Sequence, residues 1–386
     1  MKGGLITIQQ CLIYYTIRMS EIIKTYKYRL KLSKEQEKTI DRYINTSRAV
    51  YNLALETKIY AYKSRKVSLS KFDLMKQLTD CKKEFKWMKE VPSQSLQDTI
   101  ERMDKAYQSF FKGGGFPKFA KRDRYNSILF KQVKQVDNYI FKLPKLGTVT
   151  IFKDRQPKGE LRNATITRVN NKYYMSVVTK QEVEELSIPN DSQVGIDMGI
   201  SFFATLSTGK QIENPRHTLK YAKRLRVESR SLARKKKGSK SRAKQRLKVA
   251  KLHEKIRRVR KDFLHKQSKS IVDEFGFIAV EDLKVKNMVR FGYLSKHISD
   301  ASWSEFFRQL SYKSEWSGNT FIKVDPRYTS QTCFDCGTVD KKSRVSQSKF
   351  VCTSCGTESN SDINASNIIL SRGTALIRQR EALACA

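Results

Sequence analysis

The sequence predicts a multidomain α+β protein, in which a helical lobe is inserted in a small β-barrel and an α/β unit with an inserted four-cysteine cluster follows. Three observations predict this class. Helical spacing dominates residues 33 to 112, short strands separated by turn residues come next, and the second half contains two buried apolar strands. At 386 residues the chain can bury more than one core, so several domains are expected.

The charge balance points to a polyanionic partner. Lys and Arg number 77 against 38 Asp and Glu, a formal net charge of +39. Nucleic acid is the commonest partner for such a surplus, with a membrane surface as its rival. No window approaches 18 apolar residues, so we expect no spanning helix and no membrane partner. Four of the seven cysteines lie in one cluster, which favours a reducing compartment, and we expect a cytoplasmic protein.

The amino-terminal part begins with a strand and continues with helices. Residues Ile22 to Leu32 alternate between apolar and basic side chains, which predicts a half-buried strand. Ser33 and Gln36 match a capping box at the start of the helical spacing. The lobe is rich in aromatic residues mixed with Lys, so it either grips nucleic acid or packs an ordinary helical core, and both interpretations stay open. These aromatics are Tyr60, Tyr62, Phe72, Phe85, Trp87, Tyr107, Phe110 and Phe111.

Short strands follow a glycine-rich turn at residues 113–117. Their number and turn signals predict a small barrel. Because the strand at Ile22–Leu32 has no strand neighbours in the sequence, we expect it to pair into this barrel. The predicted strands are Ser127–Phe130, Tyr139–Leu143, Thr148–Phe152, Ala164–Val169 and Tyr173–Thr179.

Residues 216–270 carry much of the positive charge. They contain 23 Lys and Arg against three acidic residues, a surplus of 20. Apolar residues recur at helical spacing in the second half of the stretch, which predicts a long helix, and Lys235–Lys240 is the expected loop before it. A charge run is usually a solvated face, but a single-signed excess this large favours contact with phosphates.

Three acidic residues interrupt apolar segments. Asp197 lies within the buried strand Val194–Ile200, and Glu281 continues the apolar run of Phe275–Val280. Asp362 lies near the start of a predicted helix, where it could also be a simple cap. Burying a carboxylate without a partner costs several kcal/mol, on the order of the penalties measured for buried charges.

Together the three acids suggest a catalytic metal site. Two divalent ions about 3.5–4 Å apart can hydrolyse a phosphodiester when converging carboxylates hold them. Carboxylate oxygens suit Mg²⁺ or Mn²⁺ better than Zn²⁺. Asp197 on the first strand of a hairpin, Glu281 at the end of a later strand and Asp362 at a helix start would provide such a set.

The cysteine cluster is the most specific signal in the chain. Cys333, Cys336, Cys352 and Cys355 form two C-x-x-C-G knuckles separated by 15 residues. Four thiolates at this spacing predict a closed, structural Zn²⁺ site, with redox-active pairs as the alternative. Because the cluster falls between Glu281 and Asp362, it is an insertion in the segment that carries the acids.

These motifs resemble the TnpB (OrfB) proteins encoded by insertion sequences and labelled transposases, which are related to compact type V CRISPR effectors. The resemblance rests on GIDMG, AVEDL, the TSQTCFDCG…CTSCG ribbon and DINASNI, in this order over about residues 190–370. It implies a RuvC-like (ribonuclease-H-like) α/β nuclease with catalytic acids Asp197, Glu281 and Asp362 and with zinc on the four cysteines. Family members often carry Arg and Ala where this chain has Ser361 and Ser366.

The resemblance also implies a function and a domain plan. The family's activity is RNA-guided, divalent-metal-dependent cleavage of double-stranded DNA beside a short motif. We expect a monomer with its guide RNA. The alternatives are an RNA-guided or DNA-binding repressor or transposition accessory that does not cut, and, less favoured, a transposase that joins strands. The expected parts are an extension without stable structure (1–20, with Met19 an alternative start), a wedge-like barrel (21–32 and 116–185), a recognition lobe (33–115), the nuclease (190–330 and 358–372), the ribbon (331–357) and a tail (373–386).

Overall fold

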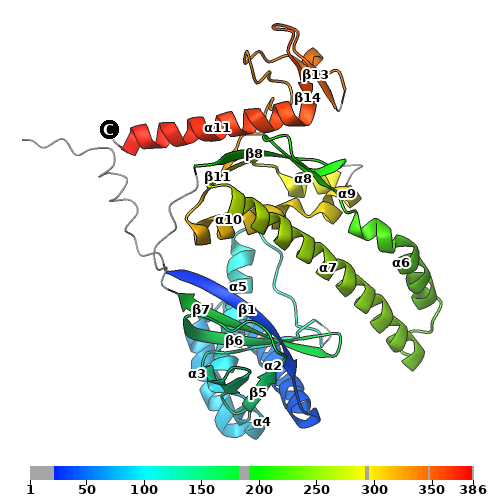
Figure 1. Cartoon of the computed structure of the whole chain (residues 1–386). Helices are drawn as coiled ribbons and strands as arrows, with labels where there is room; N and C mark the ends of the chain where they lie inside the picture. Colours follow the sequence, from blue (N-terminus) through cyan, green and yellow to red (C-terminus); the bar gives the residue numbers. More distant parts are fainter. Residues whose placement is uncertain (1–20, 123, 182–190, 292–294, 347, 385–386) are drawn as a thin grey trace, which may run out of the picture. The chain divides into compact units, whose positions relative to one another are not determined.

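The structure, a computed structural model, describes residues 21–122, 124–181, 191–291, 295–346 and 348–384. The chain forms two compact units, Met1–Glu184 and Glu185–Ala386, and each is described by itself (Figure 1). The extension predicted at residues 1–20, including Met19, lies outside the described residues. None of the described helices is both long and apolar enough to cross a membrane.

The first unit combines a strand, a helical segment and a set of antiparallel strands. Its helices and strands share one hydrophobic core, in which Leu96 and Ile100 of the helical segment belong with Phe130 and Phe141 of the strands. The elements are β1 (Ile22–Lys31), α2 (Lys34–Arg65), α3 (Lys71–Glu84), α4 (Lys86–Lys89), α5 (Ser93–Phe111), β2 (Ser127–Phe130), β3 (Lys134–Asp137), β4 (Ile140–Leu143), β5 (Gly147–Ile151), β6 (Glu160–Val169) and β7 (Lys172–Gln181).

Strand β1 lies in the middle of the sheet of this unit. The strand order is β2-β6-β7-β1-β5-β4-β3, and β1 pairs antiparallel with β7 over Ile22–Arg29 and with β5 at Leu30 and Lys31. Except for Ile23, which is 68% exposed, its apolar side chains are buried, while Lys27 and Lys31 are exposed, as the alternation predicts. Helices α2 to α5 are therefore inserted between strands of one sheet.

The predicted closure into a barrel is not observed. Within the described residues, β2 and β3 are the outermost strands of the seven and do not pair with each other. Strand β3 was not predicted from the sequence, because it is short and polar and its Val136 is 60% exposed, so it shows no apolar alternation. Its position at the end of the order leaves the sheet open.

The capping box at the start of α2 is confirmed. The Ser33 hydroxyl oxygen accepts a hydrogen bond from the Gln36 backbone N–H at 3.1 Å, and the Gln36 side-chain oxygen accepts one from the Ser33 N–H at 3.0 Å. Two of the N–H groups that a helix start leaves without partners are satisfied in this way.

The second unit contains a mixed sheet, long helices on its two faces and the cysteine ribbon. The described elements are β8 (Gln193–Met198), β9 (Phe202–Leu206), β10 (Gln211–Glu213), α6 (His217–Ala233), α7 (Lys240–Glu274), β11 (Phe277–Glu281), α8 (Val285–Phe291), α9 (Ser295–Ala301), α10 (Trp303–Ser317), β12 (Thr320–Val324), η1 (Lys341–Ser343), β13 (Lys349–Val351), β14 (Glu358–Asn360) and α11 (Ser361–Ala384).

The sheet of this unit is buried on both faces. Its order is β10-β9-β8-β11-β12, with β11 parallel to both β8 and β12 and with β8, β9 and β10 antiparallel. Successive side chains of a strand point to opposite faces. Ile278 and Val280 accordingly share a core with α7 and α10, whereas Phe277 and Ala279 share one with Ile369 of α11. Figure 1 shows α11 on one face of the sheet and α7 and α10 on the other.

The backbone of helix α11 packs directly against the backbone of β8 at Gly195. A Cβ atom added to Gly195 would lie 2.0 Å from the carbonyl oxygen of Ser366 and 2.7 Å from the backbone N of Leu370. A side chain at Gly195 would therefore prevent this contact, and the face of β8 that bears Gly195 is the face covered by α11.

Helices α6 and α7 form a basic hairpin. The chain turns between them at residues 234–239, where Gly238 adopts a φ of 87°, and this matches the predicted loop. The side chain of Gln245, on α7, is buried and donates to the backbone oxygen of Glu228 at 3.0 Å and to its carboxylate at 2.6 Å. These bonds join α6 to α7 beneath a surface rich in Lys and Arg.

Candidate metal centres

The pleat of the sheet directs two of the predicted acids to one face, and the helix that covers this face carries the third. Asp197 lies two residues after Gly195 on β8, and Glu281 follows Phe277 and Ala279 in the two-residue period of β11. Both acids therefore belong to the face that α11 covers. Asp362 lies in the first turn of α11. Three segments distant in the sequence thus bring their carboxylates to one end of the sheet.

The electrostatics of Asp197 show that the acids interact. Burial is the largest cause that raises the pKa of Asp197 to about 7, and the neighbouring carboxylates of Glu281 and Asp362 raise it further. Burial also raises the pKa of Glu281 and that of Asp362. The oxygens of the three acids do not all lie within 4.8 Å of one another in the described structure. The arrangement is a partly buried negative cluster whose mutual repulsion a cation would relieve.

Asp362 is not the cap of its helix. The side-chain oxygen of Asn360 accepts hydrogen bonds from the backbone N–H groups of Asp362 at 2.9 Å and Ile363 at 3.2 Å. Because Asn360 satisfies these groups, the carboxylate of Asp362 is available to another partner. The alternative that the sequence left open for Asp362 is therefore excluded by the geometry.

Asp282, the acid beside Glu281, has a different environment. Its carboxylate lies 2.7 Å from the Lys284 ammonium and 3.6 Å from that of Lys323, and its side chain is 43% exposed. The hydrogen bond from Lys284 is the largest cause that lowers the pKa of Asp282. Asp282 is a surface ion-pair residue, which makes it a matched control for Glu281.

Two residues near the acids were not found by sequence reasoning. Arg344, within the cysteine ribbon, places its guanidinium 3.8 Å from a carboxylate oxygen of Asp362, and its charge lowers the pKa of both Asp362 and Asp197. Thr329 is buried and donates its hydroxyl to Glu281 at 2.5 Å. Arg344 is an isolated basic residue in a polar loop and carries no signal in one sequence, whereas Thr329 begins the TSQTCFDCG motif, which by itself does not indicate a contact with Glu281.

The donor set at this end of the sheet fits a hard divalent cation. It offers carboxylate oxygens, which suit Mg²⁺ or Mn²⁺, and it contains no thiolate or imidazole among the residues just described. Asp197, Glu281 and Asp362 would hold the ions. Bound ions would supply a water of lowered pKa and stabilise the leaving oxygen of a phosphodiester.

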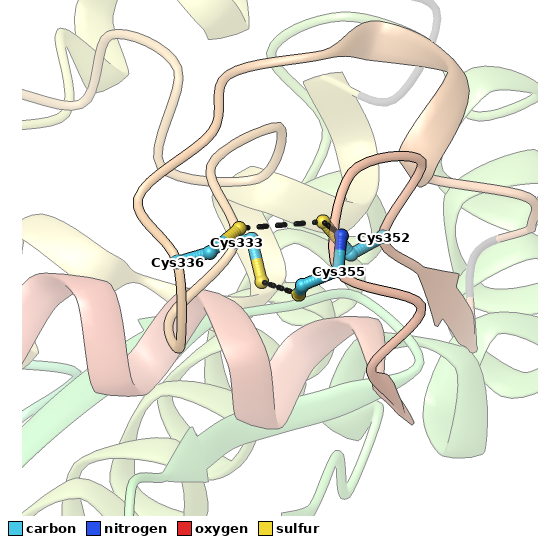
Figure 2. A group of neighbouring side chains, drawn as sticks. All are labelled: Cys333, Cys336, Cys352 and Cys355. Atoms are coloured by element: carbon cyan, nitrogen blue, oxygen red, sulfur yellow. Dashed lines mark hydrogen bonds between the residues drawn. The ribbon is translucent and has the colours of Figure 1, made fainter.

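The four predicted cysteines converge at the ribbon (Figure 2). Their sulfur atoms all lie within 4.8 Å of one another, with Cys333 Sγ 3.7 Å from Cys355 Sγ and Cys336 Sγ 3.5 Å from Cys352 Sγ. A tetrahedral Zn²⁺ with Zn–S bonds of about 2.3 Å places its sulfurs about 3.8 Å apart. The cluster therefore fits a four-thiolate zinc site, and its filled coordination would make the ion structural.

The two knuckles repeat the same backbone geometry. Gly337 and Gly356 have φ of 74° and 75°, and each donates its N–H at 3.0 Å to the carbonyl oxygen of the first cysteine of its knuckle. The left-handed conformation is one that glycine adopts without strain. The Thr338 hydroxyl lies 3.3 Å from Cys336 Sγ and is the largest cause that lowers the pKa of that thiol to about 6. A thiolate is the form that zinc binds.

The aromatic residues of the helical lobe mostly face outward. Of the eight that the sequence singled out, only Tyr107 is buried, and Phe72 and Phe111 are 69% and 76% exposed. Lysine ammonium groups lie over several of the rings: Lys58 over Tyr107 at 4.8 Å, Lys66 over Tyr62 at 5.5 Å and Lys71 over Phe72 at 5.0 Å. Of the two interpretations left open, the geometry favours a surface that can stack on bases and contact phosphates.

Comparison with known proteins decides the family. A protein of Escherichia coli K12, named "Putative RNA-guided DNA endonuclease InsQ", is 34% identical over 92% of this chain and 93% of its own length. The chain belongs to the TnpB family. A second TnpB relative, from Streptomyces pristinaespiralis and named "Putative RNA-guided DNA endonuclease", is 32% identical over 92% of this chain and 91% of its own length.

Family profiles and a solved structure agree with this assignment. Residues 176–292 match the profile described as "Probable transposase", residues 303–369 match the Cas12f1-like TNB domain, and residues 19–66 match a helix-turn-helix domain. In this TnpB chain the described part of 19–66 is a strand and one long helix, not two helices joined by a turn. The protein in a Cas12f1–sgRNA–target DNA complex shares the fold, with a TM-score of 0.60 and 15% identity over 90% of this chain and 98% of its own.

Proposed function

We propose that this protein is an RNA-guided DNA endonuclease of a transposable element, which cleaves double-stranded DNA beside a short target-adjacent motif through a single RuvC-like site that requires Mg²⁺ or Mn²⁺. The convergence of Asp197, Glu281 and Asp362 on the face covered by α11 carries this proposal. The names of the curated relatives support the guide RNA and the DNA target.

The remaining surfaces have roles in this proposal. The guide RNA and the heteroduplex it forms would be held through their backbones by the exposed basic hairpin α6–α7 and by the aromatic and lysine surface of the helical lobe. Base pairing would supply the sequence specificity, so the protein needs no reader of the whole target. We further propose that residues 190–330 and 358–372 form the nuclease domain and that the zinc ribbon 331–357 is an insertion in it.

In the proposed reaction the chain's own residues do three things. Asp197, Glu281 and Asp362 would hold the ions at one end of the sheet, and the bound ions would supply positive charge to a scissile phosphate there. Thr329 fixes one oxygen of Glu281. Arg344, which pairs with Asp362 in this structure, would offer its positive charge to a phosphate that enters the site.

The test is a cleavage assay on the complex as it is made in cells. The protein is co-expressed with its genomic flank, the bound RNA is sequenced, and the complex is incubated with Mg²⁺ and a plasmid library that matches this RNA. We expect bound RNA and cutting beside one short motif. Glu281→Gln abolishes cutting while Asp282→Asn leaves it within about twofold of the wild type, because only Glu281 faces the other acids.

Two outcomes would reject the proposal. Bound RNA without Mg²⁺-dependent cutting would assign the chain to the repressor class, in spite of its three acids. Equal loss of cutting in Glu281→Gln and Asp282→Asn would show that the face covered by α11 is not the reaction site.

A further inference from the structure

One short segment connects the zinc ribbon to two of the three acids. This connecting segment, residues 329–334, follows β12 and contains the first zinc ligand, Cys333. At its beginning, the buried hydroxyl of Thr329 donates to Glu281, and this hydrogen bond is the largest cause that opposes the rise of the Glu281 pKa by burial. The orientation of Glu281 therefore depends on where the segment lies.

At its other end the segment is fixed to α11 by Asn364. The Asn364 side chain is 4% exposed, donates to the Thr332 carbonyl oxygen at 2.7 Å and accepts from the Phe334 N–H at 3.0 Å. Thr332 and Phe334 are the residues on either side of Cys333, so one carboxamide holds both backbone neighbours of a zinc ligand. Asn364 lies two residues after Asp362 in the same helical turn.

The ribbon has a further attachment to the start of this helix. The Ser361 hydroxyl donates to the Ser346 carbonyl oxygen at 3.1 Å, and the Ser361 N–H to the Ser348 carbonyl oxygen at 3.3 Å. These bonds hold the strand side of the ribbon, whereas Asn364 holds the knuckle side. The first turn of α11 is thus fixed from both sides by residues whose own positions depend on the ribbon fold.

We propose that Thr329 and Asn364 are positioning residues, through which the four-cysteine zinc centre sets the affinity of the acid site for its divalent cations. The inference rests on the proposed function, since it takes Glu281 and Asp362 as cation ligands. With zinc on Cys333 the segment is held in place, and Glu281 and Asp362 face Asp197. Without zinc the knuckle loses its covalent anchor, the bonds of Asn364 and Thr329 loosen, and the three acids separate under their mutual repulsion.

The experiment measures Mn²⁺ binding to the zinc-loaded full chain by electron paramagnetic resonance, with zinc content determined in parallel. Thr329→Val keeps the shape of the side chain and removes its hydroxyl, and it should weaken Mn²⁺ binding about 10- to 100-fold, as loss of a hydrogen bond to a metal ligand does. Thr329→Ser restores the hydroxyl and should bind within about threefold of the wild type. All three proteins should contain one equivalent of zinc.

A double-mutant cycle tests the connection to zinc. Cys336→Ser removes an exposed zinc ligand that touches neither acid, and Asn364→Leu removes both hydrogen bonds to the knuckle. Each should weaken Mn²⁺ binding, and the double variant should be no weaker than the worse single variant, because both break one connection. Asn367→Leu is the matched control, because it makes the same substitution about one helical turn after Asn364, and it should bind Mn²⁺ like the wild type.

The outcomes separate this inference from the proposed function. If the Asp197→Ala variant binds Mn²⁺ as tightly as the wild-type chain does, the cation site itself is refuted. If Asp197→Ala abolishes binding but Thr329→Val binds Mn²⁺ normally, or the Cys336→Ser and Asn364→Leu effects simply add, the positioning role is refuted and the cation site stands. Far-ultraviolet circular dichroism excludes unfolded variants, and the double-mutant cycle of Cys336→Ser and Asn364→Leu keeps the test decisive if Thr329→Val fails to fold.

Discussion

Replacing Asp197 by Asn should stabilise the protein in the absence of Mg²⁺ and Mn²⁺, and should do so more at high pH. The pKa of Asp197 is raised from 3.8 to about 7 in the folded chain, mainly by burial. Because the folded state holds this proton more tightly than the unfolded state, the carboxyl favours folding at low pH. That contribution is lost as the pH rises from about 4 to about 7.

The size of the effect follows from the same pKa. A change from 3.8 to about 7 corresponds to about 4 kcal/mol of unfolding free energy at pH 8, as an upper value, and to about 2 kcal/mol at pH 5.5. Asn is neutral at both pH values and avoids this penalty. The free energy of unfolding of Asp197→Asn should therefore exceed that of the wild type by up to about 4 kcal/mol at pH 8. At pH 5.5 the excess should be only up to about 2 kcal/mol.

Urea denaturation followed by tryptophan fluorescence is a suitable assay, since Trp303 and Trp316 belong to the same unit as Asp197. Mg²⁺ and Mn²⁺ are omitted so that no cation neutralises the acids, and no chelator is added because zinc must be retained. Asp282→Asn is the control and should show no gain at pH 8, because the pKa of Asp282 is lowered by Lys284. A loss of stability in Asp197→Asn, equal at the two pH values, would refute the reasoning.

Three other changes test the packing of the second unit. Gly195→Ala forces its new Cβ at least about 1 Å away from Ser366, and it should lower the unfolding free energy by about 1–3 kcal/mol and slow cleavage about 100-fold. Gly115→Ala, which has open space around it, is the control and should do neither. Equal melting temperatures of the two variants would contradict the close contact of α11 with β8. Cys352→Ser should remove zinc and lower the melting temperature of the second unit, as checked by metal analysis and calorimetry, and an unchanged melting curve would argue against a structural ion. Gln245→Ala leaves acceptors of the α6–α7 hairpin without their donor and should cost about 1–3 kcal/mol in urea denaturation, with normal stability as the contrary result.

The sequence predicted those features that short-range patterns determine. Alternation identified β1, the capping box identified the start of α2, and the two C-x-x-C-G knuckles identified a cluster that the structure brings within 4.8 Å. Apolar strands interrupted by carboxylates indicated where Asp197 and Glu281 would lie, because a buried charge in a strand needs a partner.

Features that depend on long-range packing were not predictable in this way. The open order of the first sheet depends on the pairing of β3, whose polar sequence has no alternation. The contact between Arg344 and Asp362 depends on how the ribbon folds back, and the hydrogen bond from Thr329 to Glu281 joins residues 48 positions apart. In the long helix α7, Leu264 is buried and Phe263 is partly buried against the same core, and helical spacing alone does not decide which of two adjacent apolar residues is fully buried.

The order in which the chain is synthesised gives the packing of α11 a further meaning. Asp197 and Glu281 emerge from the ribosome together with their strands, but the face of the sheet they share stays uncovered until the ribbon and then α11 have been made. The basic hairpin α6–α7 is made before the ribbon and before α11. A nascent chain can therefore acquire its polyanion-binding surface well before its acid cluster is complete, so that assembly with RNA can precede the capacity to cut during translation.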